Sequence, residues 1–348
     1  MVQHEKYMQR CLELAGLGMG SVSPNPMVGA VVVHNDRIIG EGYHRKYGDA
    51  HAEVNAINQV TERFDNADEL LRQSTIYVSL EPCAHYGKTP PCADLIIKHQ
   101  IPNVVVGCRD PFAQVDGKGI EKLRDAGINV VVGVLEKECQ WLNRRFFARV
   151  QKHRPYIILK WAQTTDGFFA PDDNSQLWIT GPESRKLVHQ WRAEEDAILI
   201  GKNTAAIDNP QLNVRYAHGK SPKRVVIDRR LELNPALNVF DQSVETIIFN
   251  EVKTDIDGKN KYIALEDFER YVPQYILFQL YLQDIQSVII EGGARTLNSF
   301  IEAGLWDEAR IFTGETELKK GIKAPEVSGH IVGEYSSGED KLKILVNG

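Results

Sequence analysis

Four residues in the first third of the chain have the types and the spacing of a catalytic metal site. His51 and Glu53 open the segment HAEVNAINQV, and Cys83 and Cys92 stand at the two ends of the loop CAHYGKTPPC. One histidine and two cysteines supply the nitrogen and sulfur ligands that Zn²⁺ prefers, and three protein ligands leave the fourth position of a catalytic site for water. The sequence therefore predicts one zinc ion held by His51, Cys83 and Cys92.

Glu53 is placed to act as the general acid and base of such a site. It lies two residues from His51, so it can share the site without being a metal ligand. The pattern H-x-E followed by P-C-x-x-C is the signature of zinc deaminases, in which the glutamate shuttles the proton. Here eight residues, not two, separate Cys83 from Cys92. That departure argues against an ordinary cytidine or transfer-RNA adenosine deaminase.

The same residues also allow structural interpretations. Cys83 and Cys92 could be small buried side chains at a strand–helix junction, or they could belong to a structural zinc site in which His85 supplies the fourth ligand. The other three cysteines lie on apolar patterns, and we expect them in the core: Cys11, Cys108 and Cys139.

The elements that must position these residues alternate between strand and helix signals. The pattern predicts a three-layer α/β/α domain with a mostly parallel sheet in the first half of the chain. The expected helices cover residues 4–16, 51–60, 92–100 and 119–127, and the expected strands cover 28–34, 38–44, 74–80, 103–108 and 128–134.

A basic, helix-like stretch, ECQWLNRRFFARVQKHRP, precedes a second round of alternation. We place the domain division inside it, which gives domains of residues 1–148 and 149–348, the second also α/β. Its expected strands cover residues 156–162, 197–201, 224–228, 246–250, 287–293 and 308–314, and its expected helices cover 183–196 and 294–304. The last 30 residues give no clear signal.

A Gly-Gly turn between a strand and a helix is the only chemical signal that the second half gives by itself. The segment SVIIEGGARTLNSFIEAG puts this turn at a helix N-terminus, where backbone N–H groups can bind a cofactor phosphate. The G-x-G-x-x-G fingerprint of dinucleotide-binding folds is absent, so a plain tight turn is the alternative interpretation.

The composition narrows the class of protein. The net charge is −6 and neither half is basic, so we expect no nucleic-acid partner. No run of 18 apolar residues occurs, so we expect no membrane span. The first 18 residues are typical of an amphipathic helix and not of a secretory signal. Five cysteines, an odd number at low density, favour a reducing compartment, and we expect a cytoplasmic protein.

Motifs in both halves resemble one family, the bacterial bifunctional deaminase/reductases of riboflavin biosynthesis. In the first half these motifs are SPNPMVGAVVV (23–33), GYH (42–44), HAE (51–53) and EPCAHYGKTPPC (81–92). In the second half they are LKWAQTTDG (159–167), SQLWITG (175–181), WRA (191–193), GKNT (201–204), DNPQLNVR (208–215), VVID (225–228) and EGGA (291–294). They occur in the family's order from residue 4 to about 313.

The resemblance implies a cytidine-deaminase-like first domain and a dihydrofolate-reductase-like second domain. In the first, His51, Cys83 and Cys92 hold zinc, and Glu53 serves the hydrolytic deamination of 2,5-diamino-6-(5-phosphoribosylamino)pyrimidin-4(3H)-one to 5-amino-6-(5-phosphoribosylamino)uracil. Candidates for holding the base and the phosphate are Asn25, His44, His85 and Lys88. In the second domain, NADPH reduces C1′ of the ribosyl group, as an open-chain imine, to a ribityl group.

Two sets of residues carry over to the reductase by motif. The implied cofactor contacts are Ala162, Trp178, Thr204, Asp208, Gly293, Ala294, Arg295, Thr296, Leu297, Asn298 and Ser299. The implied substrate contacts are Ser175, Arg192, Leu212, Arg215 and Glu291. Two arginines suit a phosphate monoester, which favours bidentate guanidinium partners. Lys160 and Asp166, at the end of an apolar strand, are candidates for polarising the imine or positioning the sugar.

The chain departs from the family pattern in two places. SQLW is one residue longer than the usual Ser-x-Trp, so either Ser175 or Gln176 meets the substrate. Thr164 and Thr165 stand where the family has Ser-Leu before Asp-Gly, and a threonine hydroxyl preserves the polar contact. We expect a phosphorylated pyrimidine as small-molecule partner and a homo-oligomer. The alternatives are a deaminase whose second domain only binds nucleotide, and a non-catalytic zinc-stabilised binding protein.

Overall fold

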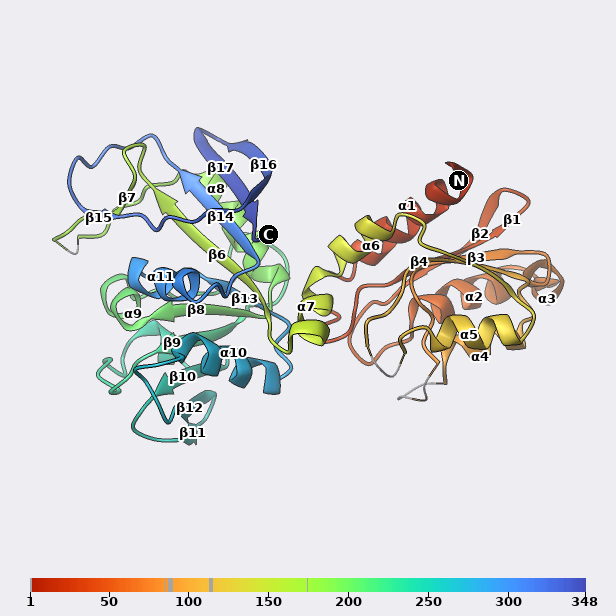
Figure 1. Cartoon of the computed structure of the whole chain (residues 1–348), viewed down its shortest axis with the longest axis horizontal. Coiled ribbons are helices and arrows are strands. Elements are labelled where there is room, and N and C mark those ends of the chain that lie inside the picture. The colour runs from red at the N-terminus through yellow and green to blue at the C-terminus, as the bar shows by residue number, and fades with distance from the viewer. Residues whose placement is uncertain (1, 85, 87–89, 113–114, 174) are drawn as a thin grey trace. The chain divides into compact units, whose positions relative to one another are not determined.

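The chain folds into two compact units, residues 1–153 and 154–348, in the computed structural model. The structure describes all residues except 1, 85, 87–89, 113–114 and 174. Figure 1 labels the elements of both units, and each unit is described here by itself. Helix α7 (Arg144–Lys152) crosses the predicted division between residues 148 and 149.

Unit 1 is built on a five-stranded sheet in the order β2-β1-β3-β4-β5. Its strands are β1 (Gly29–His34), β2 (Arg37–Tyr43), β3 (Thr75–Leu80), β4 (Asn103–Cys108) and β5 (Asn129–Val132). Its helices are α1 (Val2–Gly16), α2 (Ala52–Arg63), α3 (Ala67–Leu71), α4 (Cys92–Lys98), α5 (Lys118–Asp125), α6 (Glu136–Leu142) and α7.

Alternate residues of each strand feed two separate cores, one on each face of this sheet. From β1, Ala30 and Val32 pack with α2, α3, α4 and α5, whereas Val31 and Val33 pack with α1 and α6. This is the period of two that a strand imposes on its side chains. The second core also takes in Cys11, Cys108 and Cys139, as expected. The predicted three-layer arrangement is confirmed.

The expectation of a mostly parallel sheet in unit 1 is wrong. Strands β3, β4 and β5 are parallel, but β1 runs antiparallel to both β2 and β3. For the β1–β2 pair the cause is local, because only Asn35 and Asp36 connect the two strands and both have positive φ (45° and 60°). Two such residues make the tight hairpin turn that matches the twist of antiparallel strands.

Unit 2 is built on a ten-stranded sheet in the order β11-β12-β10-β9-β8-β13-β6-β14-β17-β16. The strands from β12 to β14 are parallel, and antiparallel strands close both ends. The strands of the sheet are β6 (Tyr156–Gln163), β8 (Ala197–Gly201), β9 (Lys223–Ile227), β10 (Thr246–Asn250), β11 (Asp255–Asp257), β12 (Asn260–Ala264), β13 (Ser287–Ile290), β14 (Glu308–Thr313), β16 (His330–Ser337) and β17 (Asp340–Val346). A small second sheet pairs β7 (Phe168–Ala170) with β15 (Ile322–Lys323).

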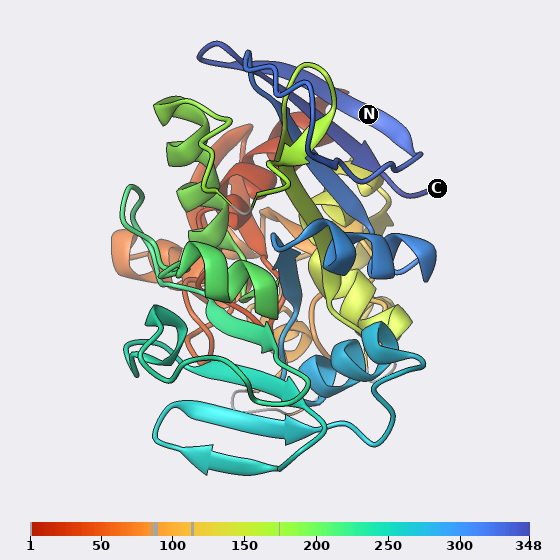
Figure 2. The same cartoon turned by 90° about the vertical axis from the view of Figure 1, so that its left-hand side faces the viewer.

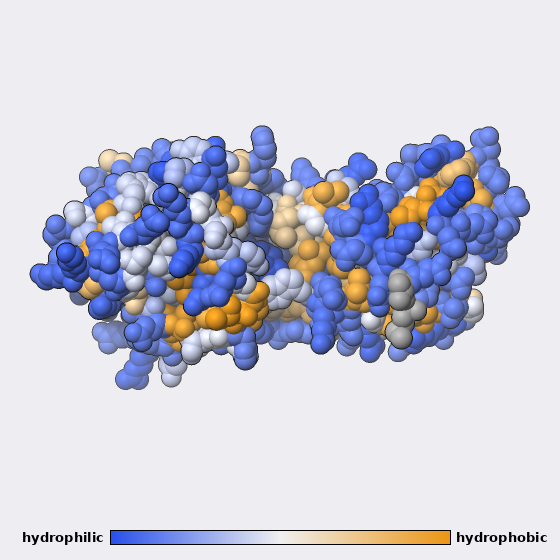
Figure 3. Space-filling view, turned by 90° about the horizontal axis from the view of Figure 1, so that it is seen from above, coloured by the Kyte–Doolittle hydropathy of each residue, from blue (hydrophilic) through white to orange (hydrophobic). Residues whose placement is uncertain are grey.

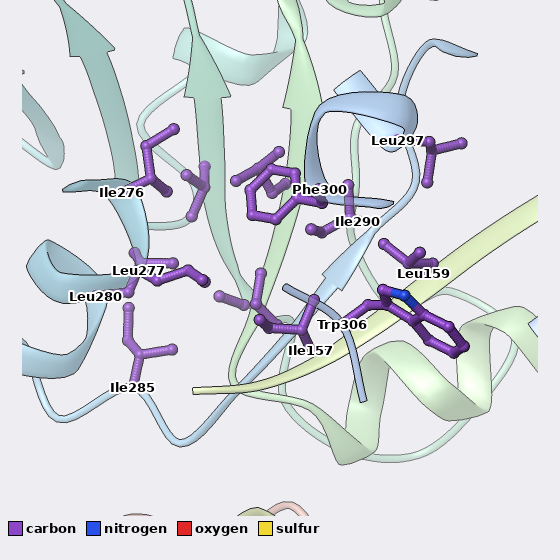
Figure 4. Close-up of a cluster of buried hydrophobic side chains, with 14 of the residues drawn as sticks. Ile157, Leu159, Ile276, Leu277, Leu280, Ile285, Ile290, Leu297, Phe300 and Trp306 are labelled. Carbon is purple, nitrogen blue, oxygen red and sulfur yellow. The ribbon is translucent and has the colours of Figure 1, made fainter. Parts of the chain in front are cut away.

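Helices cover both faces of the large sheet. They are α8 (Pro182–Glu194), α9 (Lys202–Asp208), α10 (Val272–Leu282) and α11 (Ala294–Glu302), with a short 3₁₀ turn at Asn238–Phe240. Figure 4 shows the larger core, where Ile276, Leu277 and Leu280 of α10 and Leu297 and Phe300 of α11 pack on the strands. A smaller core on the other side includes Ala205 of α9 and Ile198 and Ile200 of β8.

Most of the surface seen in Figure 3 is hydrophilic, with separate apolar patches. Within the described residues, no helix combines the length and the apolar character needed to cross a bilayer.

Candidate functional site

The predicted zinc ligands meet at one point of unit 1. His51 Nδ1 lies 3.3 Å from Cys92 Sγ and 3.6 Å from Cys83 Sγ. The three ligand atoms all lie within 4.8 Å of one another. Ligands at about 2.0–2.3 Å from a tetrahedral zinc ion are separated by distances of this order. The donor set and its spacing therefore fit one zinc ion, and the described residues supply no fourth protein ligand.

Two helix starts hold the ligands in place. His51 is the N-cap residue of α2, and Cys92 is the first residue of α4. The Cys92 backbone N–H donates to Cys83 Sγ at 3.3 Å, and the Ala93 N–H donates to the Cys83 carbonyl at 3.2 Å. Backbone N–H groups and the positive end of a helix both favour a thiolate. The long inter-cysteine loop is thus closed by the helix that follows it.

The protonation states of the three ligands are strongly perturbed. The hydrogen bond from Cys92 lowers the pKa of the Cys83 thiol to about 4, whereas the hydrogen bond with Cys83, and then burial, raise the pKa of the Cys92 thiol. The hydrogen bond with Cys83 raises the pKa of His51 to about 9. Zinc binds thiolates and neutral imidazole, so loading the site would release protons.

Glu53 lies beside this group but is not one of the three clustered ligands. It stands in the first turn of α2, and its side chain is only 3% exposed. Burial raises its pKa to about 7. A carboxyl group that gains and loses a proton near neutral pH is suited to general acid–base catalysis.

Two further predicted residues are brought to the same place, and two others lie outside the described residues. His44 packs edge-on against His51, with ring centroids 5.6 Å apart. Its Nδ1 contacts the Ala50 carbonyl at 3.2 Å and its Nε2 contacts Asn25 Nδ2 at 3.0 Å. Lys88 belongs to the undescribed part of the cysteine loop, as does His85.

Sequence reasoning missed Asp110 and the function of Glu81. Both are buried where β3 and β4 end side by side, next to the cysteine loop. The Glu81 carboxylate accepts hydrogen bonds from four backbone N–H groups, at residues 110, 117, 119 and 120. Burial raises the pKa of Asp110 to about 7. The sequence signal that could have found them is their position: both follow strands that pair in parallel, and polar residues after parallel strands gather at the carboxyl edge of the sheet.

Unit 2 contains a cavity of about 1500 Å³ that gathers most of the residues expected in the reductase. Both Ser175 and Gln176 line it. The expected cofactor contacts that line it are Ala162, Trp178, Thr204, Asp208, Gly293, Ala294, Arg295, Thr296 and Ser299. The expected substrate contacts that line it, besides Ser175, are Arg192, Leu212, Arg215 and Glu291. Leu297 instead lies in the core beside Phe300, and Asn298 is not among the residues lining the cavity.

The charged centre of this cavity is a pair between Arg192 and Glu291. Arg192 donates to both carboxylate oxygens of Glu291, at 2.7 and 3.3 Å. Burial alone would raise the pKa of Glu291, but the charges of Arg192 and Lys160 outweigh it and lower the pKa to about 2. Burial lowers the pKa of Lys160, which also lines the cavity.

His189, on helix α8 with Arg192, connects this helix to the loop that carries Arg215. Its Nδ1 accepts the Arg215 backbone N–H at 3.2 Å, and its ring packs edge-on against Tyr216. Burial and the charges of Arg192 and Arg215 lower the pKa of His189 to about 4, so the ring is neutral at physiological pH.

The Gly-Gly turn closes one side of the cavity. Gly293 is the N-cap residue of α11 with a φ of 60°, and Gly201 is the N-cap residue of α9. A Cβ atom at Gly292 would lie 2.7 Å from Ile200 Cα, so only glycine allows this approach of β13 to β8. Gly293, Ala294 and Arg295 at the start of α11 line the cavity, and the unpaired backbone N–H groups of a helix start suit a phosphate.

Asp166 does not line the cavity. Its carboxylate accepts the Thr164 hydroxyl and the backbone N–H groups of Leu318 and Lys319. It therefore fastens the loop at 316–320 to the turn after β6.

A cytidine-deaminase-like zinc domain followed by a nucleotide-binding α/β reductase domain defines the class of the chain as a bifunctional deaminase/reductase. The family model "Cytidine and deoxycytidylate deaminase zinc-binding region" matches residues 1–108, and "RibD C-terminal domain" matches residues 155–315. The riboflavin biosynthesis protein RibD of Aquifex aeolicus is 41% identical over 344 residues, covering 98% of this chain and 93% of the relative. That of Escherichia coli is 34% identical over 330 residues, with 89% and 87% covered.

Solved structures give the same result. The diaminohydroxyphosphoribosylaminopyrimidine deaminase/5-amino-6-(5-phosphoribosylamino)uracil reductase of Thermotoga maritima superposes with a TM-score of 0.91 at 36% identity, covering 100% of this chain and 99% of that one. RibD of Acinetobacter baumannii gives 0.89 at 33% identity, with the same coverage. The chain belongs to the RibD family of riboflavin biosynthesis.

The expected fold, the pair of activities and the two cofactors are thereby confirmed. The chain is a zinc-dependent deaminase and an NADPH-dependent reductase. Neither a reductase domain that only binds nucleotide nor a non-catalytic zinc protein fits this result.

Proposed function

We propose that residues 1–148 deaminate 2,5-diamino-6-(5-phosphoribosylamino)pyrimidin-4(3H)-one, and that residues 149–348 then reduce the product, 5-amino-6-(5-phosphoribosylamino)uracil, at its ribosyl group. The observation that carries the proposal is the meeting of His51, Cys83 and Cys92 beside buried Glu53. The names of the two activities come from the Thermotoga maritima relative, which this chain matches over its whole length.

In the deaminase, His51, Cys83 and Cys92 would hold the zinc ion. When bound, zinc lowers the pKa of a coordinated water towards about 7. Glu53 takes the proton that the attacking water gives up and delivers it to the departing amino group. With a pKa of about 7, Glu53 can both accept the proton from water and donate it to the leaving amino group near neutral pH. Asn25 and His44, hydrogen-bonded to each other beside His51, hold the pyrimidine, and Lys88 holds the phosphate.

In the reductase, NADPH supplies the hydride and the chain supplies its orientation. Gly293, Ala294, Arg295 and Thr296 bind the cofactor phosphates at the start of α11, where N–H groups face the cavity. The remaining cofactor contacts are Ala162, Trp178, Thr204, Asp208 and Ser299.

The substrate of the reductase binds on the side of the cavity that faces NADPH, so that the hydride passes between the two. Arg215 binds the substrate phosphate, and Arg192 presents its guanidinium group through the bidentate pair with Glu291. Lys160, next to that pair, polarises the imine at C1′. Ser175 and Leu212 complete the substrate side of the cavity.

Glu53→Gln tests the proposal. The amide keeps the shape of the carboxyl group but cannot carry a proton, so ammonia release should fall by about 10²–10⁴-fold. Bound zinc should stay at the wild-type level, and oxidation of NADPH with the deaminated substrate should be unchanged. The matched control is Glu62→Gln on the exposed face of the same helix. A Glu53→Gln protein that still releases ammonia at the wild-type rate would refute the role of Glu53.

We infer a cytoplasmic location from the state of the cysteines. All five are free, three of them in the core of unit 1 and two in the zinc site. Free thiols and zinc-binding thiolates are typical of a reducing compartment, where cysteines do not pair into disulfides. Finding the protein in a periplasmic or secreted fraction would contradict this inference.

A further inference from the structure

One end of the cavity in unit 2 is lined by two neighbouring arginines, Arg229 and Arg230. Both follow strand β9, which ends at Ile227. The substrate and cofactor contacts proposed above do not include them. Ligands of parallel sheets bind outside the carboxyl ends of the strands, and guanidinium groups at that position are suited to a phosphate.

The order of the strands gives the direction in which the cofactor extends. Strand β13 leads into the Gly-Gly turn and lies between β6 and β8, β9 follows β8, and all four strands are parallel (Figure 2). Lys160 of β6 and the pair of Arg192 with Glu291 mark the substrate end of the cavity. The nicotinamide ring has to meet the substrate there, so the adenosine half extends the other way, across β8 towards β9.

The end of β9 lies at a suitable distance for the adenosine ribose. Ile290 of β13 pairs with Leu199 of β8, and Leu199 pairs with Val225 of β9, so the three strands are level in register. Gly293 stands three residues beyond this level and Arg229 stands four residues beyond it. Since neighbouring strands are about 4.8 Å apart, the two positions are separated by about 10 Å across the sheet. A single ribose connects the pyrophosphate of NADPH to its 2′-phosphate, so a cofactor bound at Gly293 brings that phosphate near Arg229.

The acidic residues at this edge are not placed to bind a ribose hydroxyl. Sites for NADH typically present a carboxylate to the 2′-hydroxyl, whereas sites for NADPH present an arginine to the 2′-phosphate. Asp228 is 1% exposed, and its carboxylate accepts the backbone N–H groups of Glu232 and Leu233, at 3.2 and 3.0 Å. Glu232 lines the cavity but is paired with Lys202. The charge pattern therefore favours a phosphate over a free hydroxyl.

One carboxylate holds both arginines. Glu251 directly follows β10, the strand next to β9, and its Oε2 accepts Arg229 Nε at 2.6 Å. Its other oxygen lies 3.7 Å from Arg230 Nε. The Glu251 backbone N–H donates to the Arg229 carbonyl at 2.9 Å, which fixes the two loops to each other. Both guanidinium groups are thus held through Nε, and their outer nitrogens can bind a phosphate.

The one further charge near these outer nitrogens among the described residues is weakly bound. Glu269 lies 3.6 Å from Arg229 Nη2, and its side chain is 78% exposed. An exposed contact of this kind contributes little, whereas a phosphate accepts two parallel hydrogen bonds from one guanidinium group. A phosphate can therefore displace Glu269.

The same end of the cavity offers a surface for the adenine base. Phe268 and Tyr271 line it beside the arginines, and the Arg229 guanidinium lies 5.9 Å from the centre of the Phe268 ring. Aromatic and guanidinium faces stack on nucleobases. An aromatic surface next to two arginines is suited to an adenosine that carries a phosphate on its ribose.

We propose, on the basis of the cofactor placement proposed above, that Arg229 and Arg230 bind the 2′-phosphate of NADPH and so select NADPH over NADH. Glu251 is the positioning residue that holds both guanidinium groups.

Binding of two adenosine nucleotides to the full-length, zinc-loaded protein tests this selection without the reaction. Adenosine 2′,5′-bisphosphate carries the 2′-phosphate, and 5′-AMP lacks it. Titration calorimetry of the wild type should give a Kd for the bisphosphate that is about 10- to 100-fold lower than that for 5′-AMP. Both nucleotides should compete with NADPH.

Replacing both arginines by glutamine should bring the two Kd values within about threefold of each other, by weakening the bisphosphate and not 5′-AMP. Arg230→Gln alone leaves the bond between Arg229 and Glu251 in place and should remove part of the preference, and Arg230→Lys should restore most of that part. Glu251→Gln should also reduce the preference, although it keeps both arginines. The matched control is Arg270→Gln, an exposed arginine that does not line the cavity, and it should bind both nucleotides like the wild type.

A wild-type protein that binds the two nucleotides equally would overturn the proposal. A double variant that keeps the preference, or that loses both nucleotides by the same factor, would overturn it as well. Failure of the proposed reductase has a different signature, since a protein that prefers the bisphosphate through these arginines but oxidises no NADPH would contradict that function and leave this site standing. Oxidation of NADH as readily as NADPH would contradict the arginine site alone.

Discussion

Replacing Glu81 by glutamine should destabilise the deaminase unit by about 2–6 kcal/mol, although Glu81 is not one of the proposed zinc ligands. One carboxylate oxygen accepts the N–H groups of Gly119 and Ile120, at 2.9 and 3.2 Å. The other oxygen accepts those of Asp110 and Gly117, at 3.3 and 3.0 Å. A glutamine side chain keeps one acceptor oxygen and turns the other into a donor.

The size of the effect follows from that count. Two buried backbone N–H groups lose their acceptor, and each unsatisfied buried donor costs about 1–3 kcal/mol. The lost bonds fasten the start of α5 to the end of β3, next to Cys83. Zinc affinity and ammonia release should therefore fall together with stability, whereas NADPH oxidation by unit 2 should not change.

The change in the stability of unit 1 is measured by unfolding the protein in urea, with ammonia release and zinc loss as the two probes. The reductase activity of the same molecule is the internal reference. Glu121→Gln, on the exposed side of α5, is the matched control and should change stability by less than about 0.5 kcal/mol. If Glu81→Gln is as mild as this control, the carboxylate does not organise the site as described.

Three further predictions concern the metal, the charged pair and the arginine loop. Removing zinc with a chelator should abolish ammonia release and leave NADPH oxidation with the deaminated substrate intact. A loss of both activities would contradict the assignment of deamination to unit 1 and reduction to unit 2. Glu291 has a pKa lowered from 4.5 to about 2, so its stabilisation of unit 2, about 3 kcal/mol, is present above pH 4.5 and is lost as the pH falls towards 2. In the Glu291→Gln variant, the stability of unit 2 should not show this loss between pH 4.5 and 2. An acid unfolding profile identical to that of the wild type would refute the role of Glu291. His189→Phe should raise the KM for the reductase substrate more than it lowers kcat, because the Arg215 N–H loses its acceptor, whereas His189→Gln, which keeps an acceptor, should restore it.

The zinc site could be predicted from the sequence because its chemistry is local. His51 and Glu53 share the start of one helix, and Cys83 and Cys92 stand at the ends of one loop that a helix closes. Residue types and spacing were sufficient there. Asp110 could not be found in this way, since it joins the site only because β4 pairs with β3.

The fold was predictable where apolar periodicity was clear and not elsewhere. Helix α10 was missed because VPQYILFQLYL is apolar all around and shows no helical period. The strands β16 and β17 were missed because β16 mixes exposed apolar and polar residues on both faces. The antiparallel β1–β2 pair depends on the turn at Asn35 and Asp36, and the order of strands and helices along the chain does not show the direction of strand pairing.

The central claim is that one chain deaminates its substrate in unit 1 and reduces the product in unit 2. The most direct test supplies the zinc-loaded chain with the diamino-pyrimidinone phosphate and NADPH, and follows ammonia and NADPH separately. Ammonia should appear first, one NADPH should be consumed for each ammonia, and omitting NADPH should leave ammonia release unchanged. NADPH oxidation without prior ammonia release, or ammonia release that never leads to NADPH oxidation, would contradict the claim.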